Sequence, residues 1–326
     1  MITTIYSILH MFVDGICAFA MFGRFVNNGS GYAYLLIYNF CAFALQMPFG
    51  AMLDYFNREK YNKICASFGV MLTLLGAWIH PAILGVGNAL FHVGAGVDVI
   101  REDRENGWNG QALGIFVAPG AWGLFLGAQI IHGLIETLQI FLTFIIMMLI
   151  IFTKPGRRKV FAEVIDSSKI GLLIACFFVV ILRSYVGMAV TFPWKTTVFA
   201  GSIAVFAVVL GKMAGGILAA RIGIKRTIIG SLLLAAVCYF FSSNMIMGIL
   251  ALLLFNMTMP ITLYLLVRSW KELPGFSFGL LTFGLFLGFL PVYYGIQVPI
   301  SGQIIGAAGS LVSLVILLVG KGRWTQ

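Results

Sequence analysis

The sequence predicts an all-α integral membrane protein with twelve transmembrane helices in two pseudo-symmetric six-helix bundles. Hydrophobic residues make up 60% of the 326 residues, charged residues make up only 10%, and the mean hydropathy is +1.01. A surface of this composition suits a bilayer and excludes a soluble protein. Twelve crossings leave about 27 residues for each, enough for a span of ~20 residues and a short turn.

The two halves of the chain share features at a nearly constant offset, which indicates an internal repeat. The offsets are 166 positions from Gly50 to Gly216, 164 from Leu90-Phe91-His92 to Leu254-Phe255-Asn256, and 165 from Gly114 and Gly123 to Gly279 and Gly288. Transporters are often built from such duplicated halves. We therefore expect an N-terminal bundle over residues 1–153, a linker over 154–168 and a C-terminal bundle over 169–326.

Apolar runs place the predicted helices along the chain. In order, they cover residues 5–23, 32–53, 62–80, 82–100, 109–131, 134–153, 169–191, 196–219, 224–243, 245–267, 275–298 and 300–320. An even number of crossings puts both termini on one side. Of the 21 Lys and Arg residues, 17 then fall on that side and two on the other, which predicts cytoplasmic termini. The membrane expected is a bacterial inner membrane.

The cysteines and the N-terminus predict neither a reactive site nor a processing site. All five cysteines fall inside apolar runs, where they form neither a disulfide framework nor a metal-binding spacing. The N-terminus lacks a basic stretch and a cleavage site, so it is expected to be a retained first helix. We expect no cofactor, no metal and no nucleic-acid partner, and a monomer in the lipid bilayer.

A charged cluster ends the second predicted helix. The stretch from Gly50 to Lys60 places Asp54 and then Arg58 after an apolar run, and residues 216–226 repeat only its basic half, with Ala220 in place of the acid. An acid at the end of a spanning helix needs a cation or a helix N-terminus to satisfy it. The stretch resembles motif A of the major facilitator superfamily.

That resemblance implies a cytoplasmic gate. In the superfamily the motif A aspartate pairs with an arginine of helix 4 and faces the start of helix 11. Here those parts would be Asp54, Arg101 and the stretch 274–277. The other gate candidates are Gly50, Arg58, Asp98 and Arg221.

A second resemblance lies in the fourth predicted helix. Residues 87–92, Gly-Asn-Ala-Leu-Phe-His, are similar to a Phe-His-Pro stretch of the fosmidomycin-resistance branch of the superfamily, although Val93 stands where that branch has proline. The arginine of the drug-antiporter motif B is missing, with His92 at about its place. The fifth predicted helix, residues 114–127, resembles motif C of proton-driven exporters, with Pro119 permitting a bend.

Ionisable groups inside predicted spans are the candidate site, because such groups usually face a cavity or a partner. His10 and Asp14 share one face of the first helix, and superfamily helices 1, 4, 7 and 10 would bring Asp14, His92, Arg183 and Asn256 together. One interpretation is a substrate site whose acid and imidazole exchange a proton during transport. The other is a fixed ion pair between Asp14 and Arg183.

Two further polar or aromatic residues lie within spans. Trp122 can stack on an aromatic ligand or fill the core. Lys212 lies two thirds of the way along its helix, so we expect it to snorkel toward the cytoplasm.

The function expected is secondary active transport of a small organic solute, with protons as coupling ion and efflux as the first choice of direction. Residues 165–326 carry a net charge of +9 and residues 1–164 only +1, which favours an anionic or zwitterionic substrate. Uptake of an anionic metabolite and a non-transporting receptor or scaffold are the alternatives. An enzyme is not expected, since the chain has neither HExxH nor GxSxG.

Overall fold

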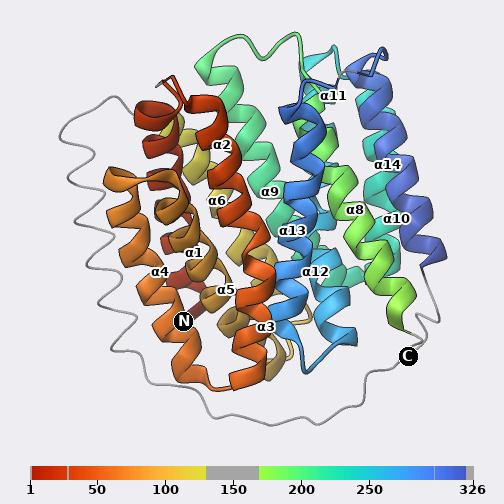
Figure 1. Ribbon diagram of the computed structural model, residues 1–326. Coiled ribbons are helices and arrows are strands. Elements are labelled where there is room, and N and C mark those ends of the chain that lie inside the picture. The colour runs from red at the N-terminus through yellow and green to blue at the C-terminus, as the bar shows by residue number, and fades with distance from the viewer. Residues whose placement is uncertain (1, 28, 130–168, 297, 321–326) are drawn as a thin grey trace.

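The computed structural model describes residues 2–27, 29–129, 169–296 and 298–320, and the parts described are helical bundles joined by short turns (Figure 1). Ten of the helical stretches there are long and apolar enough to cross a membrane. The predicted sixth helix, residues 134–153, and the predicted linker, residues 154–168, lie outside the described residues.

Five membrane crossings make up the described part of the first half. Their helices are α1 (Ile2–Ala20) with the π-helix η1 (Met21–Phe25), α2 (Gly31–Asn39) with η2 (Phe40–Ala44) and α3 (Gln46–Phe56), α4 (Glu59–Ile79), α5 (Pro81–Glu105) and α6 (Gln111–Gln129). These agree with the predicted spans to within a few residues at most ends. The sharp ends have local causes, since Asn57 takes a left-handed conformation after α3 and Pro81 opens α5 under a cap from His80.

Six helical stretches make up the described part of the second half. They are α8 (Ile170–Ala189), α9 (Val198–Ile222), α10 (Ile224–Phe240), α11 (Met245–Asn256) with α12 (Thr258–Ser269), α13 (Pro274–Tyr293) and α14 (Gly302–Val319). All but α10, which has 17 residues, are among the ten that are long and apolar enough to cross a membrane. Gly223, with φ of 97°, makes the abrupt turn from α9 to α10. Pro260 accounts for the break between α11 and α12, because it has no N–H to bond the carbonyl of Asn256.

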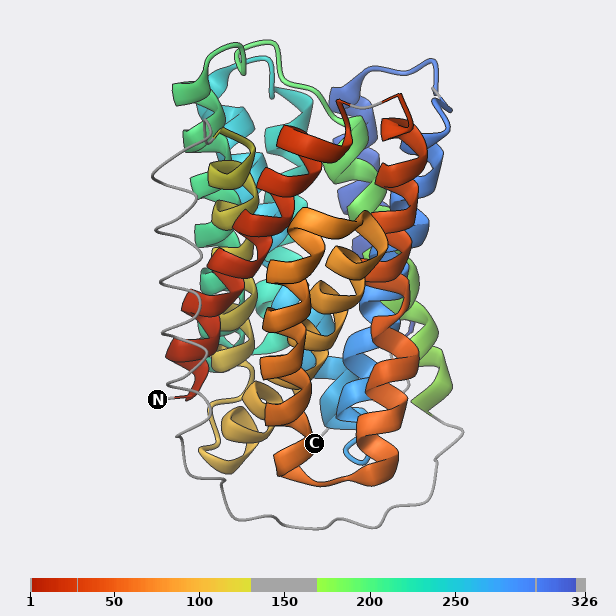
Figure 2. The ribbon, with the colours of Figure 1, turned by 60° about the vertical axis from the view of Figure 1, so that its left-hand side comes forward.

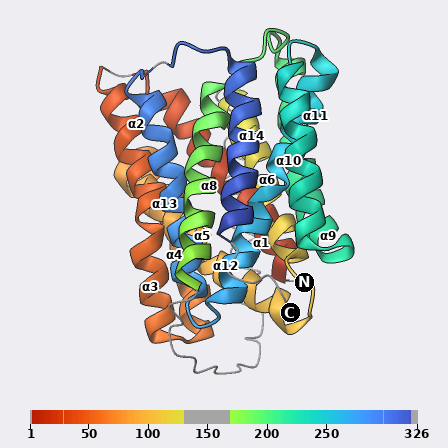
Figure 3. The same cartoon turned by 90° about the vertical axis from the view of Figure 1, so that its right-hand side faces the viewer.

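The first half lies on one side of the bundle and the second half on the other in Figure 1, and α8 lies between α13 and α14 in Figure 3. Two seams join the halves where glycines let backbones approach. Gly50 of α3 faces the Gly275 carbonyl of α13, and Gly114 of α6 lies against Gly216 of α9. A Cβ at any of these four glycines would press on backbone atoms across the seam.

The described ends of the crossings keep the predicted separation of charge. Most of the described basic residues lie in or beside the turns after α3, α5, α9 and α12, at the end where α1 begins, which is the lower end of the molecule in Figure 2. Arg24 and Lys195 lie at the opposite end, and Arg24 stacks on the ring of Trp78 with 3.4 Å to the centroid. Which compartment faces the basic end remains a prediction from the positive-inside rule.

Candidate functional site

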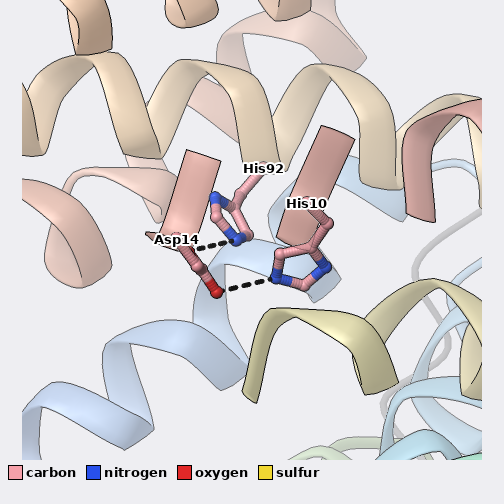
Figure 4. A group of neighbouring side chains, drawn as sticks. All are labelled: His10, Asp14 and His92. Atoms are coloured by element: carbon pink, nitrogen blue, oxygen red, sulfur yellow. Dashed lines mark ion pairs between the residues drawn. The ribbon is translucent and has the colours of Figure 1, made fainter. Parts of the chain in front are cut away.

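The first group of predicted residues to come together is His10, Asp14 and His92 (Figure 4). His10 Nε2 lies 3.1 Å from Asp14 Oδ2, and His92 Nε2 lies 3.5 Å from Asp14 Oδ1. The pair on α1 meets because a separation of four residues puts both side chains on one helix face. His92 reaches them from α5, and the three side chains are buried. We call these three residues the histidine–aspartate cluster.

Backbone and amide groups hold this cluster in place. His10 Nδ1 lies 2.7 Å from the Phe116 carbonyl of α6, and His92 Nδ1 lies 2.8 Å from the Asn88 carbonyl one turn earlier on α5. The Asn88 side-chain amide donates to Asp14 Oδ1 at 3.1 Å. Sequence reasoning missed Asn88, although its place four residues before His92 put it on the same face of the helix.

Gly120 of α6 closes the cluster on its third side. A Cβ at this position would lie against His10 Nε2 and within 2.5 Å of Asp14 Oδ2. Any larger residue would therefore take the space between the imidazole and the carboxylate. The atoms of these three side chains that could bind a metal ion lie within 4.8 Å of one another, an arrangement that was not anticipated from the sequence. Linear spacing could not reveal it because the ligands come from two helices.

Arg183 forms a second, separate group. It lines a small cavity of about 40 Å³ together with side chains of α6, α12 and α13, namely Val117, Met259, Thr262, Leu263, Phe278, Leu281, Thr282 and Leu285. The arginine is only 7% exposed, and its Nη1 has no hydrogen-bond partner. Within the part of the chain that the structure describes, no ion pair joins Asp14 and Arg183. The fixed ion pair considered from the sequence is thus not present.

Lys212 was expected to snorkel to the cytoplasm, and the structure corrects this. Its Nζ donates instead to the carbonyl of Val117 at 3.3 Å, across the seam between α9 and α6. Val117 also lines the Arg183 cavity and directly follows Phe116, which accepts from His10. One turn of α6 therefore links the cluster, the lysine and the cavity.

Asn256 and Trp122 lie apart from the cluster. Asn256 donates to the Leu252 carbonyl of its own helix, and the cavity is lined instead by Met259 and Thr262 of α12, beyond the break that follows α11. Trp122 stands two residues after Gly120, a rotation of about 200° on a helix. Its ring packs on Phe125 and on Phe206 of α9 and faces away from the cluster.

Of the predicted gate residues, Asp54 makes the expected contact and Arg101 does not. Asp54 accepts the backbone N–H groups of Gly275 and Phe276 at 2.9 and 2.7 Å, so the acid meets the start of α13 as the motif implied. Arg101 does not pair with Asp54 among the described residues. Its Nη2 donates to Asn57 Oδ1 at 3.4 Å, and its Nη1 is buried without a partner.

Gly50 lies at the seam with α13, whereas Asp98, Arg58 and Arg221 make no link between the halves in the described structure. Asp98 accepts from Tyr6 at 3.0 Å and from Asn62 at 2.8 Å, so it ties α5 to α1 and α4 within the first half. Arg58 and Arg221 are exposed at the ends of α3 and α9. In the described structure neither has an ion pair.

No family model and no curated protein sequence matches this chain. Solved structures do match: a variant of the E. coli fucose:proton symporter FucP has a TM-score of 0.64 and 12% identity over 98% of each chain. A bacterial homologue of the iron transporter ferroportin, in an outward-facing state, has a TM-score of 0.62 and 13% identity over 99% of this chain and 100% of that one.

These similarities extend over nearly the whole chain, but identities of 12–14% establish the fold alone. The fosmidomycin-resistance branch is not among the similarities described. The apolar helices and this architecture together define a multi-pass integral membrane protein. The chain has the major facilitator fold.

Proposed function

We propose that this protein is a secondary transporter of the major facilitator type that binds a small organic anion at Arg183. The observation that carries the proposal is a guanidinium group buried in a cavity between the halves without a partner among the described residues. Removing a charge from water costs several kcal/mol unless an opposite charge compensates it. A carboxylate substrate would supply that charge and could accept two parallel hydrogen bonds from Arg183.

The rest of the cavity suits a small solute with an apolar body. The walls include Leu263, Phe278 and Leu281, and the hydroxyl groups of Thr262 and Thr282 lie among them. Each threonine donates to a carbonyl of its own helix, which leaves its oxygen lone pairs free to accept from the substrate. Lys212 adds a second positive charge close to Val117. This arrangement favours an anion and disfavours a substrate with only positive charge.

Contacts between the halves support alternating access around this cavity. Helices α3 and α13 are joined at the basic end by Asp54, and α2 and α13 at the other end by Tyr32 and Tyr293. Each tyrosine hydroxyl donates to the other's backbone carbonyl, at 2.6 and 2.9 Å. Breaking one set of contacts while keeping the other would open the cavity to one side only.

Proton-driven efflux is the mode of transport we propose to test first. The similarity to a fucose:proton symporter makes the proton a reasonable coupling ion, and export follows the sequence resemblance. Uptake of an anionic metabolite is the alternative. Flux in proteoliposomes with an imposed pH gradient separates the two, and flux indifferent to the gradient would remove proton coupling.

The anion proposal is tested by binding before flux is measured. A thermal-shift screen of the purified protein against small carboxylates identifies a ligand, and its affinity is then measured for Arg183→Leu, Arg183→Lys and the exposed control Arg226→Leu. We expect Arg183→Leu to weaken binding at least ~30-fold, because truncating one partner of a buried charge pair costs about 2–5 kcal/mol. Arg183→Lys should recover part of the affinity and Arg226→Leu all of it.

Two outcomes would overturn the proposal. Unchanged affinity in Arg183→Leu would end the anion assignment. Tight binding with no flux, in the parent protein as in the variants, would instead identify a receptor or scaffold.

A further inference from the structure

The histidine–aspartate cluster has a hydrogen-bonding geometry that fixes where the ring hydrogens are. A backbone carbonyl can only accept, so the carbonyls of Phe116 and Asn88 require a hydrogen on Nδ1 of His10 and of His92. In a neutral imidazole the other nitrogen, Nε2, then carries only a lone pair. Both Nε2 atoms point toward the carboxylate of Asp14.

Three electron-pair donors therefore face one another in a buried space. An ionised carboxylate and two Nε2 lone pairs cannot satisfy each other, since all of them accept. One added proton would satisfy one of the two contacts, between Asp14 and a single imidazole. A metal ion placed among the three groups would satisfy all of them at once.

We propose that His10, Asp14 and His92 form a binding site for a divalent first-row transition metal ion. Ligand bonds of about 2.1 Å put neighbouring ligand atoms about 3.0 to 3.4 Å apart in octahedral or tetrahedral geometry. The nitrogen-to-oxygen distances of 3.1 and 3.5 Å are close to this range. The two imidazole-to-carboxylate separations are thus close to those of a metal site, and all three ligand atoms lie within 4.8 Å of one another.

The surrounding groups are those that support a metal-binding histidine. Such histidines almost always donate their other ring N–H to a carbonyl, a carboxylate or water, and both imidazoles here donate to carbonyls. Asn88 orients the carboxylate by a hydrogen bond to Asp14 Oδ1. The glycine at position 120 keeps space beside His10 Nε2 and Asp14 Oδ2 that a methyl group would fill.

The ligand set determines which ions bind. Two imidazole nitrogens and one carboxylate suit Zn²⁺, Fe²⁺, Co²⁺ or Ni²⁺. Mg²⁺ and Ca²⁺ prefer oxygen ligands and are expected not to compete. Three protein ligands leave coordination positions open for water or for an anionic group.

Titration of the purified full-length protein with ZnCl₂ tests the proposal, with MgCl₂ as the control ion. Isothermal calorimetry should find one Zn²⁺ per chain, and the visible spectrum of a CoCl₂-loaded sample should show ligand-field bands. His10→Asn and His92→Asn should each weaken Zn²⁺ binding at least ~100-fold. Asn88→Ala should weaken it about 10- to 100-fold, the usual effect of losing a supporting group.

Two matched variants distinguish this site from accidental binding. His80→Gln removes a histidine at the far end of α5 and should leave Zn²⁺ affinity unchanged. Gly120→Ala keeps every ligand but fills the adjacent space, so it should reduce affinity sharply. Thermal unfolding without metal shows whether each variant is folded.

The proposal fails if Zn²⁺ does not bind, or if its affinity is the same in folded His10→Asn and His92→Asn. That outcome would mean that the histidine–aspartate cluster binds protons and not metal ions. It would not affect the proposed function, because anion binding depends on Arg183 and is measured in metal-free protein. Conversely, loss of the anion assignment would leave the Zn²⁺ titration valid.

Discussion

Two helix N-termini at the basic end of the molecule are capped by the same chemistry but from different places. The start of α13 donates the N–H groups of Gly275 and Phe276 to Asp54, at 2.9 and 2.7 Å. The start of α6 donates the N–H groups of Gly110 and Ala112 to Asp103, at 2.7 and 2.9 Å. Each carboxylate satisfies two orphan donors and the positive end of a helix dipole.

The difference lies in which half supplies the acid. Asp54 belongs to α3 and caps a helix of the opposite half, whereas Asp103 belongs to α5 and caps the next helix of its own half. A movement between the halves must break the bonds of Asp54, but it carries Asp103 and α6 together. We therefore propose that Asp54 acts as a latch between the halves and that Asp103 belongs to a rigid body.

In the described structure, one of the two seams has an acid at this place and the other does not. Gly50 faces the Gly275 carbonyl across one seam, and Gly216 faces the Gly110 carbonyl across the other. Four residues after each glycine stand Asp54 and Ala220. Ala220 has no carboxylate, so close packing without an acid joins that seam.

The largest expected effect comes from Asp54→Ala. Two charge-assisted hydrogen bonds are lost, worth about 2–3 kcal/mol together, so the equilibrium between closed and open basic ends should shift about 30- to 150-fold. Spin labels at two exposed sites, Tyr55 of α3 and Lys225 of α10, measure the distance across this end. We expect a new population at longer distance. An unchanged distance distribution would show that Asp54 is only a helix cap.

Asp103→Ala is the matched test, with a smaller effect of another kind. It should lower the free energy of unfolding by about 1–2 kcal/mol, as the loss of a helix cap does. The distance between the same two spin labels should not change. If Asp103→Ala opens the basic end as far as Asp54→Ala does, the distinction between latch and rigid body is wrong.

The sequence predicted most of the helices and the contact of Asp54 at the basic end. The apolar runs predicted the crossings in the described part of the chain, and the motif A resemblance predicted that Asp54 would meet the start of α13. Arg101 was the wrong partner because a helix end leaves a long side chain several acceptors, and here it reaches Asn57. Asp103 was missed because its acceptor role depends on the turn between α5 and α6.

The candidate site was also predicted in part. Spacing along α1 predicted that His10 and Asp14 share a face, but the approach of His92 from α5 depends on helix rotation. The Arg183 cavity depends on the break at Pro260, which brings Met259 and Thr262 to its wall in place of Asn256. The positions of these side chains thus depend on contacts between helices that are distant in sequence, which the periodicity of a single helix does not predict.

A change at the opposite end of the α13 seam should have a smaller effect of opposite direction. Tyr32→Phe removes one hydrogen bond to the Tyr293 carbonyl, worth about 0.5–1.5 kcal/mol, and keeps the ring stacking at 4.1 Å. It should weaken closure at the end where Arg24 lies and leave the spin-label distance at the basic end no longer than in the parent protein. A longer distance there would mean that the two ends do not act in opposition.

The smallest effect is expected from Ala220→Asp in an Asp103→Asn background. The neutral amide accepts less strongly, so the N–H groups at the start of α6 become available to a carboxylate from α9. Ala220 is half-buried and stands in the same relation to Gly216 and Gly110 as Asp54 does to Gly50 and Gly275.

The new acid should therefore cap α6 from the opposite half. A gain of about 0.5 kcal/mol is expected, because desolvation of the added charge offsets much of the hydrogen bonding. The shorter spin-label distance should become more populated than in Asp103→Asn alone. Ala220→Asn is the control, since it adds similar volume without the charge, and an equal shift in both variants would assign the effect to packing. A shift specific to the carboxylate would show that the place of the acid, and not the strength of the cap, turns a helix start into a latch.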